Sequence, residues 1–336
     1  MKYKIFFLIY AVSFVSCMDE VKKKCDLGRY PVEHCKLNVH KMDTGLICPQ
    51  SINVFKDKLL VMEPQKDISK ISVFDRKRFA FLFSDIDEGR AKYEVINLRG
   101  DYYACTDTSF FVLDNNIEKE YSLHGNHIKY IGYVPITIPD ALNQLLRIGE
   151  EKYITSGLTS GEGHEHLLYD DGEYEGFGEY PELYVSSSKT FVLNAKVSAG
   201  MVGKEQIWDF YLNHNLVRSY NLYGDLLMEI EIENASQKTK ITDSQDSEFY
   251  FYDAKWNSDY IAVLYNERYS WLEFYLSGDA AQRMHELQLW TWNGELKRRI
   301  RFDKHFDFYA LSEDNIFYAM DAELPNVIYT YDFEEK

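Results

Sequence analysis

The feature of this sequence that most limits its possible folds is a recurring set of short apolar runs separated by turn residues. The last part of the chain shows the pattern most clearly. Leu287–Trp292 alternates between apolar and other residues and is closed by Asn293-Gly294, which is the strongest short signal for a β-hairpin. Leu296–Phe302 follows as the expected partner strand. The pattern predicts antiparallel strands joined in chain order.

The same four-run pattern can be followed backwards as far as Ser51, in six sets. Each of several runs consists of alternating apolar residues, then an aromatic residue or Leu, then Asp or Asn. These runs are Ile71–Asp75, Phe111–Asp114, Leu167–Asp170, Leu289–Asn293 and Ile328–Asp332. A four-stranded unit cannot bury both of its faces alone, so several units pack around an axis. The repetition favours an all-β, six-bladed β-propeller over a sandwich or two stacked β-domains.

The two ends of the repeat support this interpretation. The sixth set contains only three strands, Phe306–Leu311, Ile316–Met320 and Val327–Tyr331. Near the N-terminus, Leu37–Met42 alternates as a strand but has no hairpin partner close by. Pairing this strand with the sixth set would close the ring and hide an exposed sheet edge. We therefore expect a propeller closed by its own N-terminal strand.

The second set is predicted to contain the four strands Tyr93–Leu98, Tyr102–Cys105, Ser109–Leu113 and Ile117–Leu123. The fifth set is interrupted after its second strand by Asn266–Met284, a segment rich in aromatic residues. We expect this insertion to lie on a face of the propeller.

The N-terminus has the features of a targeting segment. Lys2 and Lys4 precede the apolar run Ile5–Val15, which is too short to span a bilayer. The run ends at Phe14-Val15-Ser16-Cys17, which is typical of a lipobox whose cysteine is lipidated, although Phe14 departs from the usual Leu. An ordinary signal peptide with an incidental cysteine is the alternative. We expect a lipoprotein signal peptide at residues 1–16, lipidation of Cys17, a tether at 17–35 and the propeller at 36–336.

Charge and cysteine content narrow the classes of partner and site. The formal net charge of −17 repels phosphate backbones and argues against nucleic-acid binding. The remaining cysteines are Cys25, Cys35, Cys48 and Cys105, an even number in an oxidising compartment. A disulfide such as Cys25–Cys35 is compatible with this number, and so are free buried thiols. The absence of any CxxC spacing argues against a zinc site.

Several of these residues together resemble a known family. They are the lipobox-like Phe14–Cys17, the strand end Val73-Phe74-Asp75, the run Trp290–Leu296 and the closing strands between Phe308 and Asp332. In these the chain resembles the TolB-like six-bladed propeller lipoproteins of Gram-negative cell envelopes. Of a glycine-rich turn common in that family, the segment Asp87–Glu94 keeps only Gly89, Arg90 and Glu94. The resemblance implies an outer-membrane lipoprotein, periplasmic or surface-facing, that binds or scaffolds and has no agreed enzymatic role.

No motif for a common enzyme class is present. His164-Glu165-His166 places two histidines on the same side of a strand, where they could hold a metal with a carboxylate, but no third ligand is evident. A solvated loop and strand start is the better interpretation. His124–His127 is typical of a turn. The Asp170-Asp171-Gly172 sequence is more typical of a turn than of a carboxylate pair for acid–base catalysis. We expect no catalytic residue, no metal ligand and no cofactor.

The aromatic interruption offers a candidate contact surface. Trp271, Phe274 and Tyr275 would form a platform for a protein or saccharide partner if they are exposed on one face. A small helix or hairpin covering the side of the propeller is the alternative. The sequence therefore favours a lipid-anchored binding or scaffold module in the cell envelope. The competing hypothesis is an envelope hydrolase, or a lactonase-like propeller, that uses carboxylates and Ca²⁺ at the mouth of its channel.

Overall fold

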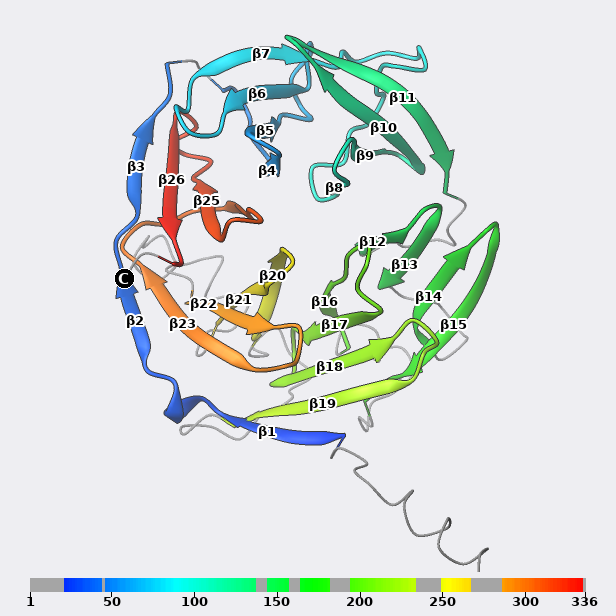
Figure 1. Ribbon diagram of the computed structural model, residues 1–336, viewed down its shortest axis with the longest axis vertical. Helices are drawn as coiled ribbons and strands as arrows, with labels where there is room; N and C mark the ends of the chain where they lie inside the picture. The colour runs from blue at the N-terminus through cyan, green and yellow to red at the C-terminus, as the bar shows by residue number, and fades with distance from the viewer. Residues whose placement is uncertain are drawn as a thin grey trace, which may run out of the picture.

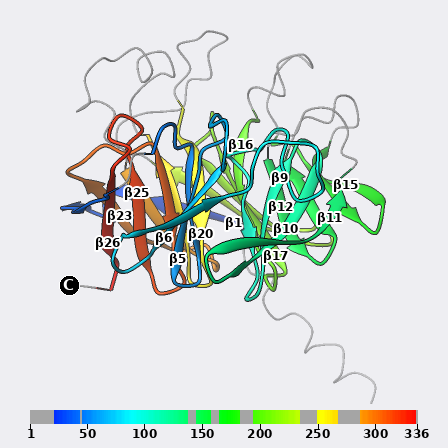
Figure 2. The same ribbon diagram turned by 90° about the horizontal axis from the view of Figure 1, so that it is seen from above.

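The structure is a computed structural model, which describes residues 21–43, 46–136, 144–156, 164–181, 194–233, 249–266 and 286–334. Within these ranges the chain forms six β-sheets and no α-helix. The sheets stand around a common centre as the blades of a ring (Figure 1). Seen from the side, the ring is flat and its strands run between its two faces (Figure 2). No helix among these residues is long and apolar enough to cross a membrane.

The blades are numbered here in chain order, with strands given from the centre outward. Blade 1 comprises β4 (Ser51–Phe55), β5 (Lys58–Met62), β6 (Ile71–Asp75) and β7 (Phe81–Asp85). Blade 2 comprises β8 (Ala104–Cys105), β9 (Phe110–Asp114), β10 (Ile117–His124) and β11 (His127–Pro135). Blade 3 comprises β12 (Gln144–Gly149), β13 (Lys152–Ser156), β14 (His164–Asp170) and β15 (Glu173–Glu179).

The other three blades each include a strand from the N-terminal part of the chain. Blade 4 comprises β16 (Lys196–Ala199), β17 (Gln206–Tyr211), β18 (Leu216–Asn221), β19 (Leu226–Glu233) and β1 (Lys22–Asp26). Blade 5 comprises β20 (Phe251–Trp256), β21 (Tyr260–Tyr265), β22 (Glu286–Thr291), β23 (Leu296–Phe302) and β2 (Val32–Cys35). Blade 6 comprises β24 (Phe308–Leu311), β25 (Ile316–Met320), β26 (Val327–Asp332) and β3 (Asn38–Lys41).

The closure predicted from the sequence is confirmed. β3 pairs antiparallel with β26, with Val39 opposite Tyr329 and Lys41 opposite Val327. The hairpin at Asn293-Gly294 is also present, joining β22 to β23 with Gly294 at a φ of +76°. A side chain at Gly294 would place its Cβ 2.5 Å from the Trp208 ring of blade 4, so the turn needs glycine for its backbone and for its packing.

The expectation of a tether at residues 17–35 is wrong for residues 22–35. β1 adds to β19 and β2 adds to β23, both in parallel, as fifth strands at the outer edges of blades 4 and 5. Residues 22–41, called the strap below, therefore run along the rim of three consecutive blades (Figure 1). The sequence pattern failed because outer strands are half exposed, and the three consecutive lysines at 22–24 conceal the alternation.

Specific side chains hold the strap to the ring. Between β1 and β2 lies a 3₁₀ turn, Leu27–Arg29, and Leu27 is buried between blades 4 and 5. Arg299 donates hydrogen bonds from Nη1 to the carbonyl oxygens of Leu27 (3.1 Å) and Tyr30 (3.2 Å). Further along, Arg298 forms an ion pair with Glu33 of β2 at 2.6 Å. The strap is thus part of the folded ring, because it contributes to both the apolar core and the buried hydrogen bonding.

Two further expectations are corrected. In blade 2, Tyr93–Leu98 is not a blade strand; the outer strand is β11, the second arm of the β10–β11 hairpin. The four cysteines Cys25, Cys35, Cys48 and Cys105 are free thiols. Cys25 and Cys35 do not form a disulfide because they lie on strands added to different blades.

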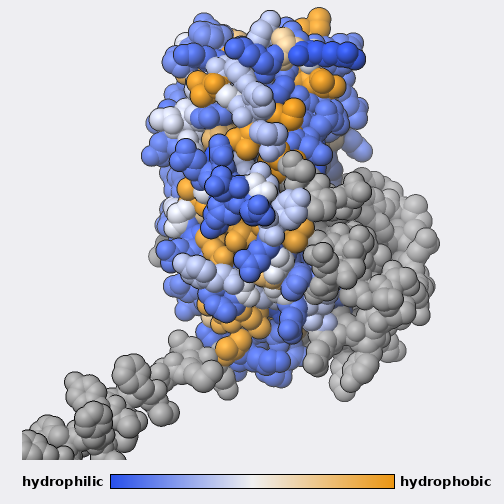
Figure 3. All heavy atoms as spheres, turned by 90° about the vertical axis from the view of Figure 1, so that its right-hand side faces the viewer, coloured by the Kyte–Doolittle hydropathy of each residue, from blue (hydrophilic) through white to orange (hydrophobic). Residues whose placement is uncertain are grey.

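The apolar core is divided among the six interfaces between neighbouring blades. Each hydrophobic cluster joins one blade to the next around the ring. Among the residues that the structure describes, the two interfaces of blade 3 contain six buried apolar residues each, whereas the other four contain between 10 and 16. The rim over blades 2 and 3 is mainly hydrophilic with scattered apolar residues (Figure 3). These two apolar-poor interfaces hold the buried polar groups described next.

Candidate functional site

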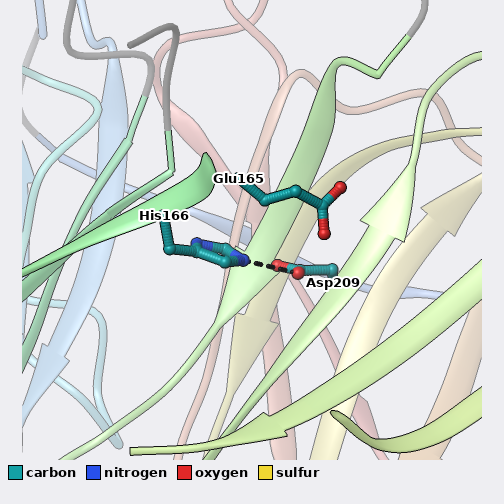
Figure 4. A group of neighbouring side chains, drawn as sticks. All are labelled: Glu165, His166 and Asp209. Carbon is teal, nitrogen blue, oxygen red and sulfur yellow. Dashed lines mark hydrogen bonds and ion pairs between the residues drawn. The ribbon is translucent and has the colours of Figure 1, made fainter. Parts of the chain in front are cut away.

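The most concentrated group of titratable side chains lies between blades 3 and 4. His166 of β14 and Asp209 of β17 meet across the interface, with Nε2 and Oδ2 2.7 Å apart (Figure 4). The carboxylate of Glu165 lies beside them, and one ligand atom from each of the three residues lies within 4.8 Å of the others. All three side chains are buried. The His166 ring packs against Phe177 at 4.9 Å between ring centroids.

A local irregularity brings two consecutive residues into one site. Neighbouring residues on a strand normally point to opposite faces of the sheet. Here the pairing of β14 with β15 runs from His164–Glu179 to His166–Phe177 and omits the position between. Gly178, opposite Glu165, has a φ of +75°, and a Cβ there would approach Glu165 Cβ to 3.3 Å. The glycine therefore permits the distortion that directs both Glu165 and His166 toward blade 4.

Blade 4 supplies hydrogen bonds and positive charge to Glu165. Tyr211 donates to Oε1 at 2.6 Å and Tyr220 donates to Oε2 at 2.7 Å. The Lys196 Nζ lies 3.4 Å from Oε1, and the Arg218 guanidinium lies 3.7 Å from Oε2. Burial and the neighbouring carboxylate raise the pKa of Tyr211 well above its ordinary value, so it remains a donor at neutral pH.

Asp209 is held in its charged form by the same surroundings. Burial would raise its pKa, but the charges of His166 and Lys196, together with a 2.6 Å hydrogen bond from Ser198, outweigh burial and lower the pKa. Lys196 Nζ lies 3.9 Å from Oδ2. Among the described residues, Nδ1 of His166 has no hydrogen-bond partner.

The chemical types of these three side chains suit a divalent metal, since one imidazole and two carboxylates could ligate it. Its geometry favours a different role. The carboxylate oxygens already accept hydrogen bonds from hydroxyl groups and contact two cations, and the three side chains are enclosed. A buried ionic network whose carboxylates are paired in this way fixes the relative position of two blades. We therefore interpret this group as a structural ion-pair network at an interface with few described apolar residues.

A second enclosed network lies between blades 2 and 3. Glu118 of β10 accepts hydrogen bonds from Tyr102 and Tyr153 and pairs with Arg147 of the innermost strand β12. The Arg147 guanidinium also lies 3.9 Å above the centre of the Phe111 ring. Burial raises the pKa of Glu118 despite these partners. Both apolar-poor interfaces therefore contain a buried glutamate that contacts two tyrosines and at least one cation.

A third group with metal-ligand chemistry lies in blade 6. It comprises His305 and Asp307, which precede β24, and Asp321, which follows β25. His305 Nε2 lies 3.2 Å from Asp307 Oδ1, while Asp307 Oδ2 accepts the Ala322 backbone N–H at 2.7 Å. Asp321 caps the next turn by accepting the Glu323 N–H at 2.8 Å. Local backbone bonds thus account for much of this arrangement.

The innermost strands determine which side chains are available for chemistry at the axis of the ring. Their one carboxylate is Asp253, counting the six strands β4, β8, β12, β16, β20 and β24 as the structure describes them. Its Oδ1 lies 3.4 Å from Lys255 Nζ and accepts the Ala254 N–H. Acid–base hydrolysis by a carboxylate pair needs two such groups facing one substrate. The described inner strands do not supply them.

The structure can be compared with the predictions made for individual residues from the sequence. β14 begins at His164, before the strand start expected at His166, and His166 and Glu165 are buried rather than solvated. His164 takes no part in their cluster and packs over Gly176, where a Cβ would lie 2.5 Å from its ring. The turn at Asp170–Gly172 is confirmed, with Gly172 at a φ of +86°.

Other expectations concern residues beyond the described ranges. The lipidation residue Cys17 and the platform residues Trp271, Phe274 and Tyr275 lie there. The partners Asp209, Lys196 and Arg218 were not predicted from the sequence. The one available signal was a charged residue inside the otherwise apolar run Ile207–Tyr211.

Comparisons with known proteins agree with the fold. No family model and no curated protein matches this sequence. A solved structure named "Putative exported protein" from Bacteroides fragilis is 11% identical, with a TM-score of 0.53, covering 92% of this chain and 98% of that one. A member of the DUF4221 family from Bacteroides vulgatus is 10% identical, with a TM-score of 0.57, covering 88% and 95%. At these identities the likeness supports the propeller fold and nothing further.

Proposed function

We propose that this protein is a lipid-anchored β-propeller of the cell envelope that binds a protein or saccharide partner and does not catalyse a reaction. The observation that carries the proposal is the composition of the innermost strands. In the described part of the chain these strands hold one carboxylate, Asp253, and it is paired with Lys255. Their two other charged groups, Arg147 and Lys196, are engaged with buried glutamates.

The buried clusters support the same proposal. A catalytic group must reach its substrate, whereas Glu165, His166 and Asp209 are enclosed between blades and hold one another. The described inner strands and this buried cluster therefore give the hydrolase hypothesis no support. Envelope localisation is supported by the lipobox-like Phe14–Cys17, by the resemblance to TolB-like lipoproteins, and by the name of the exported Bacteroides fragilis neighbour.

In this proposal the partner contacts Trp271, Phe274 and Tyr275. The test is site-specific photocrosslinking in the native envelope, with the photoreactive residue placed at position 274. The control is the same residue at Tyr133 of β11, a side chain that is 59% exposed on the rim of blade 2. We expect one discrete adduct from position 274 that is absent from position 133. Equal labelling from both positions, or none from position 274, would contradict the assignment of this surface.

The absence of catalysis is tested separately. The purified chain is assayed against lactone and ester substrates with and without Ca²⁺, beside a variant in which Asp253 is replaced by Asn. We expect no turnover above background in any combination. Turnover that requires Ca²⁺ or Asp253 would favour the hydrolase hypothesis instead.

A further inference from the structure

The N-terminal end of β1 lies at the outer edge of blade 4. In blades 1 to 5 the connections from the first to the second strand and from the third to the fourth lie on one face, called here the hairpin face. In blade 6 only the first of these connections exists, because its fourth strand is β3. β1 runs parallel to β19 and therefore starts near that face, at the outer edge of blade 4. The carbonyl of Val21 accepts the Glu229 N–H at 2.6 Å. The chain is thus firmly attached to the rim from its first described residue.

Only residues 18–21 separate Cys17 from the first residue of β1, Lys22. Five steps between Cα atoms span at most about 18 Å even in a fully extended chain. If Cys17 is lipidated, as the proposed function holds, the bilayer surface lies within that reach of the blade 4 rim. The ring therefore cannot turn freely at the end of a long linker, and one part of its surface stays near the membrane.

The end of blade 4 nearest to this attachment carries two exposed apolar side chains. Tyr223 in the β18–β19 turn is 92% exposed, and Leu227 at the start of β19 is 42% exposed. Tyrosine is enriched at the headgroup level of a bilayer, and leucine inserts at the boundary between headgroups and acyl chains. We call these two residues the blade 4 corner.

The turn that presents Tyr223 is rigid. The Asn221 side chain accepts the backbone N–H groups of Tyr223 (3.0 Å) and Asp225 (2.9 Å) and donates to the Asp225 carboxylate (2.9 Å). Gly224 has a φ of +89°, and a Cβ at that position would lie 2.6 Å from Phe177 of blade 3. The turn is therefore anchored on its inner side, and the tyrosine is held outward without a described packing partner.

The charges around the blade 4 corner are largely balanced. Lys22 pairs with Glu229 at 3.1 Å, and Lys24 pairs with Glu233. Lys23 is exposed on the opposite face of β1. Because two of the three lysines are already paired, attraction to anionic lipid is weak, and contact depends on the apolar side chains.

We propose that the blade 4 corner rests in the headgroup region of the bilayer that carries the lipid anchor. Tyr223 and Leu227 contact the lipid, so the propeller is held by one rim in a defined orientation. Blades 1 and 2, which lie across the ring from β1 (Figure 1), are then directed away from the membrane and are accessible to a partner. This inference rests on the lipidation of Cys17 in the proposed function.

The experiment uses the full lipidated chain in phosphatidylcholine vesicles that contain brominated lipid, which quenches tryptophan at the headgroup and upper acyl level. Tyr223→Trp places a reporter at the corner, and Tyr93→Trp places a matched reporter on the side of blades 1 and 2, where Tyr93 is 57% exposed. We expect the emission added by Trp at position 223 to be mostly lost, and that added at position 93 to be unchanged. High salt leaves the result unchanged.

Flotation with the vesicles separates the two possible failures. If Cys17→Ser abolishes flotation while the tryptophan emission of Tyr223→Trp is not quenched, the lipid anchor is supported and the placement of the corner is refuted. Equal quenching of both reporters refutes the placement as well. If the full chain does not float, or floats equally well as the Cys17→Ser variant, the lipid anchor of the proposed function is refuted, and the inference fails with it.

Discussion

The ionic network between blades 3 and 4 gives the sharpest test of how this ring is held together. Lys196→Met removes a cation that lies 3.4 Å from Glu165 Oε1 and 3.9 Å from Asp209 Oδ2, while keeping a side chain of similar length. Both carboxylates have fully buried side chains. The variant therefore leaves two negative charges in an enclosed site with less compensation.

Breaking a buried pair from one side costs about 3–5 kcal/mol, because the remaining charge cannot be hydrated. For roughly 300 folded residues the entropy of unfolding is about 0.6 kcal/mol/K, so a loss of this size lowers Tm by about 5–8 °C. Glu165→Gln alone is expected to destabilise the protein in the same way. The double variant removes one charge of each sign, so its cost is expected to fall below the sum of the single costs by about 2 kcal/mol.

The assay is equilibrium unfolding in urea, with calorimetry for Tm, on the wild type, the two single variants and the double variant. Lys152→Met serves as the matched control, since the Lys152–Asp170 pair at 2.8 Å is part exposed and such pairs contribute about 1 kcal/mol or less. Additive costs within about 0.5 kcal/mol in the cycle would refute the coupling. A cost for Lys196→Met as small as that of the control would refute the claim that the network holds the interface.

Three further outcomes follow from the structure. Leu27→Ala should lower the free energy of unfolding by about 2–5 kcal/mol, because it opens a cavity where the strap enters the core between blades 4 and 5; a cost below about 0.5 kcal/mol in urea unfolding would mean that the strap is peripheral. Gly294→Ala should markedly lower Tm, since its Cβ would lie 2.5 Å from Trp208, whereas Gly125→Ala, with a φ of +60° and open space around it, should lower it less; equal losses would argue against the packing explanation. The folded-state pKa of Asp209 is lowered below 3.8, so its contribution to the free energy of unfolding is present above pH 3.8 and is lost as the pH falls. Asp209→Asn should therefore lose stability less steeply than the wild type below about pH 4, as measured by acid titration followed by circular dichroism.

The sequence was sufficient for the architecture because the architecture depends on local signals that repeat. Alternating apolar runs and turn residues such as Asn293-Gly294 report the position of strands without knowledge of distant partners. The pairing of β3 with β26 could be predicted by elimination, since one set lacked a strand and one strand lacked a set. Blade 2 was misjudged because Tyr93–Leu98 has the composition of a strand but packs over β10, with the Tyr93 carbonyl accepting a hydrogen bond from Tyr121 at 3.2 Å.

The candidate sites were much less accessible to sequence reasoning. His164 and His166 attracted attention because they are close in the sequence, yet the partner that matters to His166 is Asp209, which lies 43 positions away on another blade. Asp209, Lys196 and Arg218 have no recognisable spacing relative to Glu165. Their proximity follows from the packing of blade 3 on blade 4, which no local pattern records.

What the sequence determined by itself, then, was an all-β chain of six repeated sheets with a supplementary N-terminal strand, since strand periodicity and turn chemistry are properties of neighbouring residues. Only the tertiary structure decided which polar residues are buried together and that residues 22–35 extend two blades instead of forming a tether. The physical reason is the same in both cases. A buried charge and an outer strand are each stabilised by partners that are distant in sequence. Their positions are therefore determined only by the packing of the blades.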